Sequence, residues 1–241
     1  MAAYIRDDKE MSVWDHVGEL RKRLLWAMGA MVLGVAASFF GLATTFIEWL
    51  ALPGGGMENF VAIEVTESFN VFMRISLLSG FIMALPVIVW QILGFVVPGL
   101  YDNERRWVFS AIPIATLLFV AGVAFSYFVM LPTAIPFLRG FLEVTPMWRL
   151  ANYINFATNM MFWIGLSFEM PLVIFMLAKF GVVKWRMLLN QWRFAVVIIA
   201  VLAAMITPTV DPVNMAILMV PLFAIYLLSV LFAAFARPSE N

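Results

Sequence analysis

The feature that most constrains this chain is a set of long segments without a charged residue. One such segment runs from Trp107 to Leu138, and another runs from Leu24 to Ile47. With 64% hydrophobic and 12% charged residues, the chain has too little polar surface to cover a soluble globule. Lipid also requires every backbone polar group to be hydrogen-bonded within the protein, and these runs are too long for barrel strands. The sequence therefore predicts an all-α membrane protein.

Six helices are predicted to cross the membrane and to form one polytopic domain over residues 1–241. The expected spans cover about 24–46, 68–93, 107–131, 153–178, 193–206 and 213–236. A charged arm, 1–23, precedes them and becomes helical from Ser12, as a short amphipathic helix that lies at the membrane surface and runs into the first span. The fifth span is short, because thirteen residues from Phe194 to Ile206 make about 20 Å of helix against a hydrocarbon core of about 30 Å.

The basic residues predict the orientation of these spans. With six spans, both chain ends and the loops 94–106 and 179–193 share one side of the membrane. That side holds twelve of the fifteen basic residues, namely Arg6, Lys9, Arg21, Lys22, Arg23, Arg105, Arg106, Lys179, Lys184, Arg186, Arg193 and Arg237. The positive-inside rule then predicts that both termini are cytoplasmic.

Enzymatic and cofactor chemistry is not expected. The chain has no cysteine, which excludes disulfides, thiolate metal sites and thiol catalysis, and its single histidine argues against a histidine metal site. It carries no Ser–His–acid set, no HExxH and no phosphate-binding loop. We expect neither a cofactor nor a nucleic-acid partner.

Three of the polar side chains inside the predicted spans are candidates for a specific role. Glu169 is the most costly, so it should face the protein interior or a wet cavity, or else form a structural hydrogen bond to a neighbouring helix. Pro171 predicts a kink beside it. Arg74 is expected to extend toward the membrane edge, and Gln91 is a candidate for a hydrogen bond between helices.

Two glutamates are expected at the cytoplasmic face, each beside an apolar membrane entry. Glu19 precedes Arg23 by four residues, which predicts an ordinary ion pair on a helix, and His16 is expected to be solvated. Pro98-Gly99 predicts a turn, after which Asp102 or Asn103 can cap a new helix with Glu104 in its first turn. Separated carboxylates suit guanidinium groups, so a ligand with adjacent arginines and then an apolar stretch would fit.

These residues also occur in an order typical of a known family. The motifs are His16-Val17-Gly18-Glu19-Leu20-Arg21-Lys22-Arg23-Leu24, Ala84-Leu85-Pro86 with Gln91 and Phe95, Pro98-Gly99-Leu100-Tyr101 with Glu104-Arg105-Arg106, Gly122 with Phe125, Tyr127-Phe128 and Pro132, and Phe168-Glu169-Met170-Pro171. Through them the chain resembles TatC, the multispanning core of the twin-arginine protein translocase, from about Trp14 to Phe232.

The resemblance implies a cup of six helices in the cytoplasmic membrane whose rim binds twin-arginine signal peptides of folded cargo. The implied signal-binding residues are Glu19, Leu20, Arg21, Pro98, Glu104 and Arg105. Glu169 would face the concave side, the fifth span would contact single-span partners of the TatA and TatB type, and copies of the chain would self-associate. A small-solute transporter or channel, with Glu169 and Gln91 as a midplane site, and a purely structural scaffold are the alternatives.

The chain departs from the family pattern at three places. Thr207-Pro208-Thr209-Val210-Asp211-Pro212-Val213-Asn214 is one residue longer before its acid than the family's motif. Tyr226 is followed by Leu227 where the family has a glutamate, and Arg74 stands where it has a lysine. The changes at 207–214 and Leu227 affect expected polar contacts between the fifth and sixth spans, whereas Arg74 keeps the charge.

Overall fold

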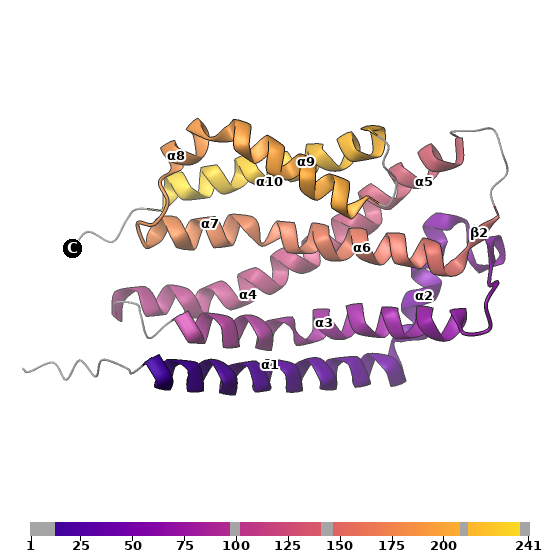
Figure 1. Cartoon of the computed structure of the whole chain (residues 1–241), viewed down its shortest axis with the longest axis horizontal. Coiled ribbons are helices and arrows are strands. Elements are labelled where there is room, and N and C mark those ends of the chain that lie inside the picture. The colour runs from indigo at the N-terminus through magenta and orange to yellow at the C-terminus, as the bar shows by residue number, and fades with distance from the viewer. Residues whose placement is uncertain (1–12, 97–101, 141–146, 208–211, 237–241) are drawn as a thin grey trace, which may run out of the picture.

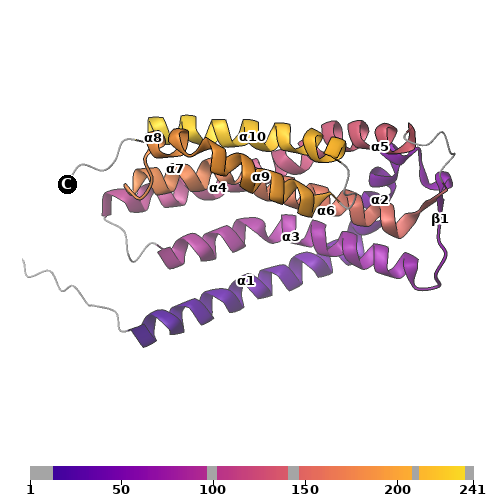
Figure 2. The ribbon, with the colours of Figure 1, turned by 45° about the horizontal axis from the view of Figure 1, so that its top comes forward.

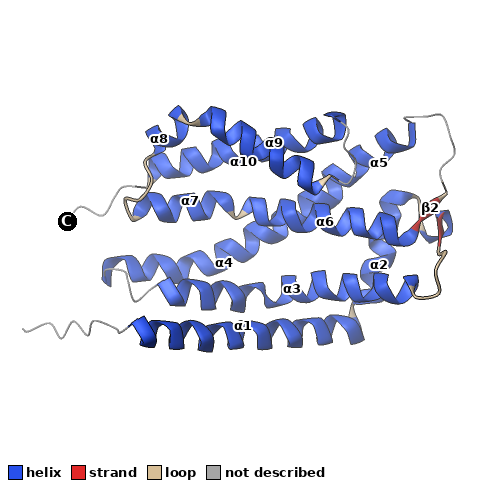
Figure 3. Cartoon of the chain, in the orientation of Figure 1, coloured by secondary structure: helices blue, strands red, loops and turns tan. Residues whose placement is uncertain are grey.

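The computed structural model describes residues 13–96, 102–140, 147–207 and 212–236, and nearly all of them are helical (Figures 1 and 3). The helices are α1 Val13–Gly41, α2 Ala43–Ala51, α3 Glu67–Val96, α4 Asp102–Phe125, α5 Leu131–Gly140, α6 Leu150–Phe168, α7 Met170–Lys179, α8 Trp185–Asn190, α9 Trp192–Ile206 and α10 Pro212–Phe235. Shorter elements are two 3₁₀ turns, Leu52–Gly54 and Met57–Asn59, a π-helical segment, Ser126–Met130, and the strands β1 Phe60–Val61 and β2 Trp148–Arg149.

The long helices run side by side, so the bundle has two distinct ends (Figure 1). One end holds the start of α1, the junction of α3 and α4, helix α8 and the end of α10; we call it the terminal end. The opposite end holds α2, the end of α5 and the two strands; we call it the loop end. The helix ends predicted to share one side of the membrane therefore share one end of the bundle.

Five helical stretches of the described chain are long and apolar enough to cross a membrane. They are Trp14–Gly41, Glu67–Phe95, Ala111–Leu138, Leu150–Lys179 and Met215–Phe235. The remaining predicted span is the shorter apolar helix α9, with 15 residues. The length and apolar composition of these helices therefore make the chain a multi-pass membrane protein.

The boundaries of two predicted spans were wrong. The first ends at Gly41 rather than near 46, because Leu42 has a φ of −123°, outside the helical region, and the chain turns there into α2. The helix predicted for the arm does run into the first span, since α1 is continuous from Val13 to Gly41. The third span continues through the π-helical segment and α5 to Gly140, so part of a predicted loop is helical.

Helix α1 lies at the edge of the bundle. Only 11% of the residues in its most apolar window are buried, against 39% for α3, on which it packs. Gly34 and Gly80 bring the two backbones together, because a Cβ on Gly34 would lie 2.5 Å from the Gly80 carbonyl oxygen. The hydroxyls of Ser38 and Ser79 form a buried hydrogen bond one turn further along. Close approach through small residues is how membrane helices associate when no hydrophobic effect drives them together.

Candidate functional site

The start of α1 is docked against the end of α3 at the terminal end. The His16 ring stacks on Phe95 with 4.2 Å between centroids and 24° between planes. The Arg23 guanidinium lies directly against Gly94, where a Cβ would collide with it. His16 remains exposed, as predicted, but it is held by an aromatic neighbour. This docking places the face of α1 that carries Glu19 beside the junction of α3 and α4.

Glu19 forms the predicted ion pair with Arg23. The Arg23 Nε donates to Glu19 Oε1 at 2.8 Å, and Nη2 contacts the same oxygen at 2.5 Å. The two side chains are 24% and 25% exposed, so a ligand can reach the pair. Both contacts fall on Oε1, which means that this pair does not use Oε2.

The other predicted signal-binding residues divide into two groups. Leu20 and Arg21 are exposed on α1 next to Glu19. Glu104 and Arg105 lie on the first turn of α4, although their side chains are outside the described part of the structure. Glu104 is in the first turn as predicted, whereas the predicted caps, Asp102 and Asn103, are already helical. Pro98 lies outside the described residues. The backbone therefore brings the helices of Glu19 and Glu104 to one end of the bundle, and their side-chain geometry stays a prediction.

Glu169 lies at a break between α6 and α7. Its N–H donates to the Leu166 carbonyl at 3.1 Å, a tighter turn than an α-helix makes, and the buried ring of Pro171 starts α7. The break confirms the kink predicted from Pro171. The proline removes one backbone donor, so the helix changes course where the carboxylate projects.

The Glu169 side chain lines a cavity of about 380 Å³ between α3, α4 and α7. The other lining residues are apolar and include Phe81, Leu85, Ile92, Phe119 and Met176. Glu169 Oε1 is buried and has no hydrogen-bond partner among the described residues. The structural hydrogen bond considered for it is therefore not formed by this oxygen.

Arg74 is held by hydrogen bonds to a neighbouring helix, and its extension toward the membrane edge stays a prediction. Its Nε donates to Thr158 Oγ1 at 2.7 Å and its Nη2 donates to Asn159 Oδ1 at 2.6 Å, both on α6. Because both acceptors lie on the neighbouring helix α6, the guanidinium is held against α6. Gln91 is half-buried, and its side chain makes no hydrogen bond to another described residue, so a bond between helices is not seen there.

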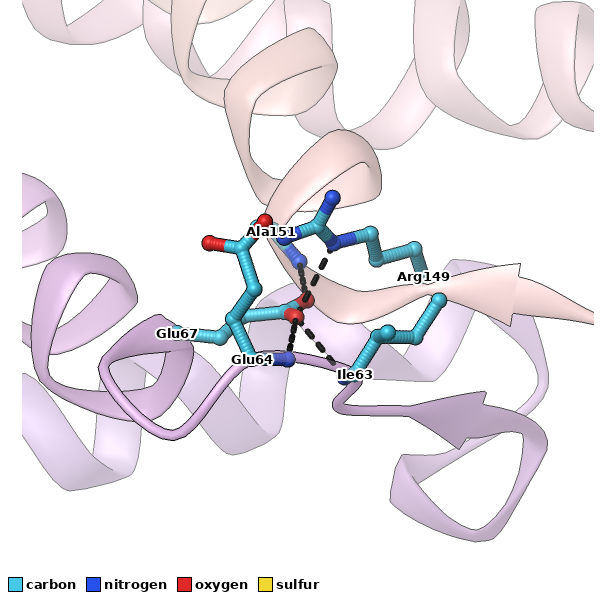
Figure 4. Close-up of polar contacts among 5 residues, drawn as sticks. All are labelled: Ile63, Glu64, Glu67, Arg149 and Ala151. Carbon is cyan, nitrogen blue, oxygen red and sulfur yellow. Dashed lines mark hydrogen bonds and ion pairs between the residues drawn. The ribbon is translucent and has the colours of Figure 1, made fainter.

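A carboxylate network at the loop end was missed by the sequence analysis (Figure 4). Glu67, 1% exposed, accepts hydrogen bonds from the Arg149 Nε at 2.9 Å and from the N–H groups of Ile63 and Ala151 at 2.9 and 2.8 Å. Glu64 adds a second carboxylate at 2.6 Å from Arg149 Nη2. The hydrogen bond from Arg149 to Glu64, followed in importance by the one to Glu67, raises the pKa of the Arg149 guanidinium above its usual value. Few basic residues were predicted on this side, and the scarcity of partners for its carboxylates was the available signal for the pairing.

The fold and these polar groups define a class. The chain is a helical multi-pass membrane protein with a half-buried ion pair at one end of the bundle, a carboxylate network around buried Glu67 at the other and further polar side chains between them. No group of three potential metal ligands occurs among the described residues.

Comparison with known proteins identifies the family. The family model described as "Sec-independent protein translocase protein (TatC)" matches residues 15–221. The chain is 34% identical over 237 residues to TatC of Carboxydothermus hydrogenoformans, covering 97% of each chain. It is 37% identical to TatC of Deinococcus radiodurans over 93% of this chain and 86% of that one. The chain therefore belongs to the TatC family.

Two further similarities agree with this assignment. A chloroplastic TATC of Arabidopsis thaliana is 37% identical over 92% of this chain and 66% of its own length. The crystal structure of a twin-arginine translocase receptor, TatC, is 33% identical and superposes with a TM-score of 0.81 over 92% of this chain and 99% of that chain. These findings support a protein-translocase component over the small-solute transporter considered above.

Proposed function

We propose that this chain is the receptor and core of a twin-arginine translocase and that it binds twin-arginine signal peptides at its terminal end. The proposal is supported by the family and by the receptor named in the crystal structure that it resembles. The observation that carries the residue assignment is the Glu19–Arg23 pair, which is reachable and lies on a helix docked against the end of α3.

Arginine recognition follows from the charges. A guanidinium binds a carboxylate with two parallel hydrogen bonds and keeps its charge, so an incoming arginine can approach Glu19 from the side of Oε2 or replace Arg23 on Oε1. Glu104 on the first turn of α4 would take the second arginine, where the helix dipole favours an anion. Exposed Leu20 offers apolar contact to the segment that follows the arginines, with Arg21, Pro98 and Arg105 around the site.

The proposed topology has six spans, with both termini in the cytoplasm and the terminal end as the cytoplasmic face of the cytoplasmic membrane. In this arrangement α9 is the short fifth span, about 22 Å long at 15 residues. Its exposed side chains follow helical spacing on one face and include Phe194, Val197, Ile198, Val201 and Met205. That face would receive TatA-like and TatB-like single-span partners, and residues 1–241 would act as one domain that self-associates in the complex.

The short fifth span also suggests a role in transport. A helix shorter than the hydrocarbon core thins the bilayer around it, and thinning would ease the passage of a folded protein. Inserting one turn of apolar residues into α9 should therefore lower export of a folded reporter. Undiminished export by the lengthened chain, at equal abundance in the membrane, would count against the thinning idea.

Crosslinking of a signal peptide tests the receptor function. A peptide with an Arg-Arg pair and a photoreactive group should crosslink to the purified full chain, while its Lys-Lys version should crosslink weakly. Glu19→Ala and Glu104→Ala should each reduce crosslinking about tenfold, because a hydrogen bond to a charged group contributes about 1.5–3 kcal/mol. The double variant should reduce it further.

A matched variant separates this site from general charge effects. Glu58 is an exposed carboxylate at the loop end, so Glu58→Ala removes the same charge from the other face. It should leave crosslinking unchanged. Equal crosslinking by the parent chain and the Glu19→Ala/Glu104→Ala double variant would falsify the carboxylate mechanism.

A further inference from the structure

Arg74 is a charged side chain within a predicted span, and its depth in the membrane limits which ligands can reach it. It lies seven residues from Glu67, the first residue of α3, or about 10 Å along the helix axis. The 30 residues of α3 make a helix of about 45 Å, which is about 15 Å longer than the hydrocarbon core. If α3 overhangs equally at both ends, Arg74 lies just inside the boundary between acyl chains and headgroups at the loop end.

The positive charge of Arg74 is hydrogen-bonded but not neutralised within the described part of the chain. Its two partners on α6, Thr158 and Asn159, are neutral. The three ion pairs among the described residues involve Arg23 and Arg149 and do not include Arg74. A half-buried cation in a span is unfavourable unless an anion or water reaches it.

The groups around Arg74 leave hydrogen-bond donors facing outward. The Thr158 hydroxyl donates to the Ile154 carbonyl at 2.7 Å and therefore accepts from Arg74. Asn159 uses Oδ1 to accept from Arg74, so its exposed side chain keeps the Nδ2 amide as a donor. The remaining guanidinium hydrogens are donors as well. A cluster of donors with a net positive charge selects an anionic acceptor.

A cavity connects these donors to an apolar surface. It has a volume of about 380 Å³ and lies between α1, α3 and α6, with Met31, Phe81 and Phe162 forming apolar walls beside the polar groups. On α6 the exposed residues Asn152 and Asn155 lie on the same face as Asn159, at helical spacing, from the loop end inward to Arg74. A ligand for this site needs an anionic head near Arg74 and an apolar tail along the walls.

We propose that Arg74, Thr158 and Asn159 form a binding site for the phosphate headgroup of an anionic phospholipid in the leaflet at the loop end. The phosphate accepts hydrogen bonds from the Arg74 guanidinium and the Asn159 amide, and an acyl chain lies against Met31, Phe81 and Phe162. The depth of Arg74 and the apolar walls favour a lipid over free phosphate, because only a lipid fills both parts of the cavity.

Native mass spectrometry of the full chain in neutral detergent tests the proposal, with phosphatidylglycerol as the probe. Arg74→Gln should lower the affinity for phosphatidylglycerol at least tenfold, and Asn159→Leu should lower it about threefold. Arg186→Gln is the matched control, because it removes the same charge from α8 at the terminal end and should leave the affinity unchanged. Equal affinity of the Arg74→Gln and Arg186→Gln chains overturns the proposal.

Two comparison ligands identify what binds, and a second variant guards against misfolding. Phosphatidylcholine, whose phosphate is balanced by an ammonium group, should bind more weakly than phosphatidylglycerol. If inorganic phosphate displaces phosphatidylglycerol at equal concentration, the ligand is the free ion and the lipid assignment is wrong. If Arg74→Gln does not fold, Asn159→Leu decides, since it keeps the charge, and an unchanged affinity of that variant overturns the proposal.

Discussion

Arg149 and Glu67 join two loops that are far apart in the sequence, with 2.9 Å between Arg149 Nε and Glu67 Oε2. Arg149 is the last residue of strand β2, and Glu67, the first residue of α3, follows strand β1 along the chain. The two strands pair in parallel, Phe60 opposite Trp148 and Val61 opposite Arg149. The ion pair and the short ladder therefore fix the start of α3 against the start of α6 at the loop end (Figure 4).

Glu67→Ala should lower the apparent Tm of the purified protein by several degrees. The substitution leaves the N–H groups of Ile63 and Ala151, and the Arg149 guanidinium, without their buried acceptor. Glu64→Ala is the control, because its side chain is 60% exposed and meets the same arginine. Similar melting curves for the two variants would contradict the structural role assigned to Glu67.

Gly80→Ala should separate α1 from α3. A Cβ at Gly80 would lie 2.5 Å from the Val35 backbone nitrogen, so one of the helices must move, and overpacking of this kind costs about 1–3 kcal/mol. Gly29→Ala on α1 is the matched control, since nothing lies within 4 Å of its added methyl and alanine favours a helix. Thermal unfolding in detergent measures both, and a Gly80→Ala chain as stable as Gly29→Ala would show that the close approach is unimportant.

Arg23→Gln should strengthen binding of an Arg-Arg peptide by a few fold. Arg23 neutralises Oε1 of Glu19, so a ligand arginine that uses this oxygen must displace an ion pair worth about 0.2–1 kcal/mol. Peptide crosslinking against concentration gives the affinity. Weaker binding by Arg23→Gln would mean that Arg23 supports the site, through its contact with Gly94, more than it competes for Glu19.

Glu169→Gln should retain more transport than Glu169→Ala or Glu169→Leu, because glutamine keeps a hydrogen-bonding group in the cavity between α3, α4 and α7. Glu169→Leu should raise the apparent Tm, since it removes a buried polar atom that has no partner among the described residues. Export of a folded reporter and thermal unfolding, measured on the same variants, check both statements. Transport by the leucine variant at the parental level would exclude a polar role for Glu169.

Local patterns predicted the parts of the fold that depend on local chemistry. Uncharged runs located the helices, the spacing of Glu19 and Arg23 predicted their ion pair, and Pro171 predicted the break after α6. These features need only the helical repeat and the missing N–H of proline. Where local chemistry was ambiguous the prediction failed, as at Leu42, where an apolar run continues although the helix axis turns.

By itself the sequence determined that this chain is a helical membrane protein and which motifs it shares with TatC. It also determined which helix ends and loops carry the basic residues. Only the tertiary structure decided which polar side chains on different segments of the chain are partners. Glu67 meets Arg149, and Arg74 meets Thr158 and Asn159, across 82 to 85 positions of sequence. The physical reason is that charge and hydropathy act through the surrounding solvent and can be read locally, whereas a hydrogen bond needs two groups within about 3 Å, and helix packing alone sets that distance.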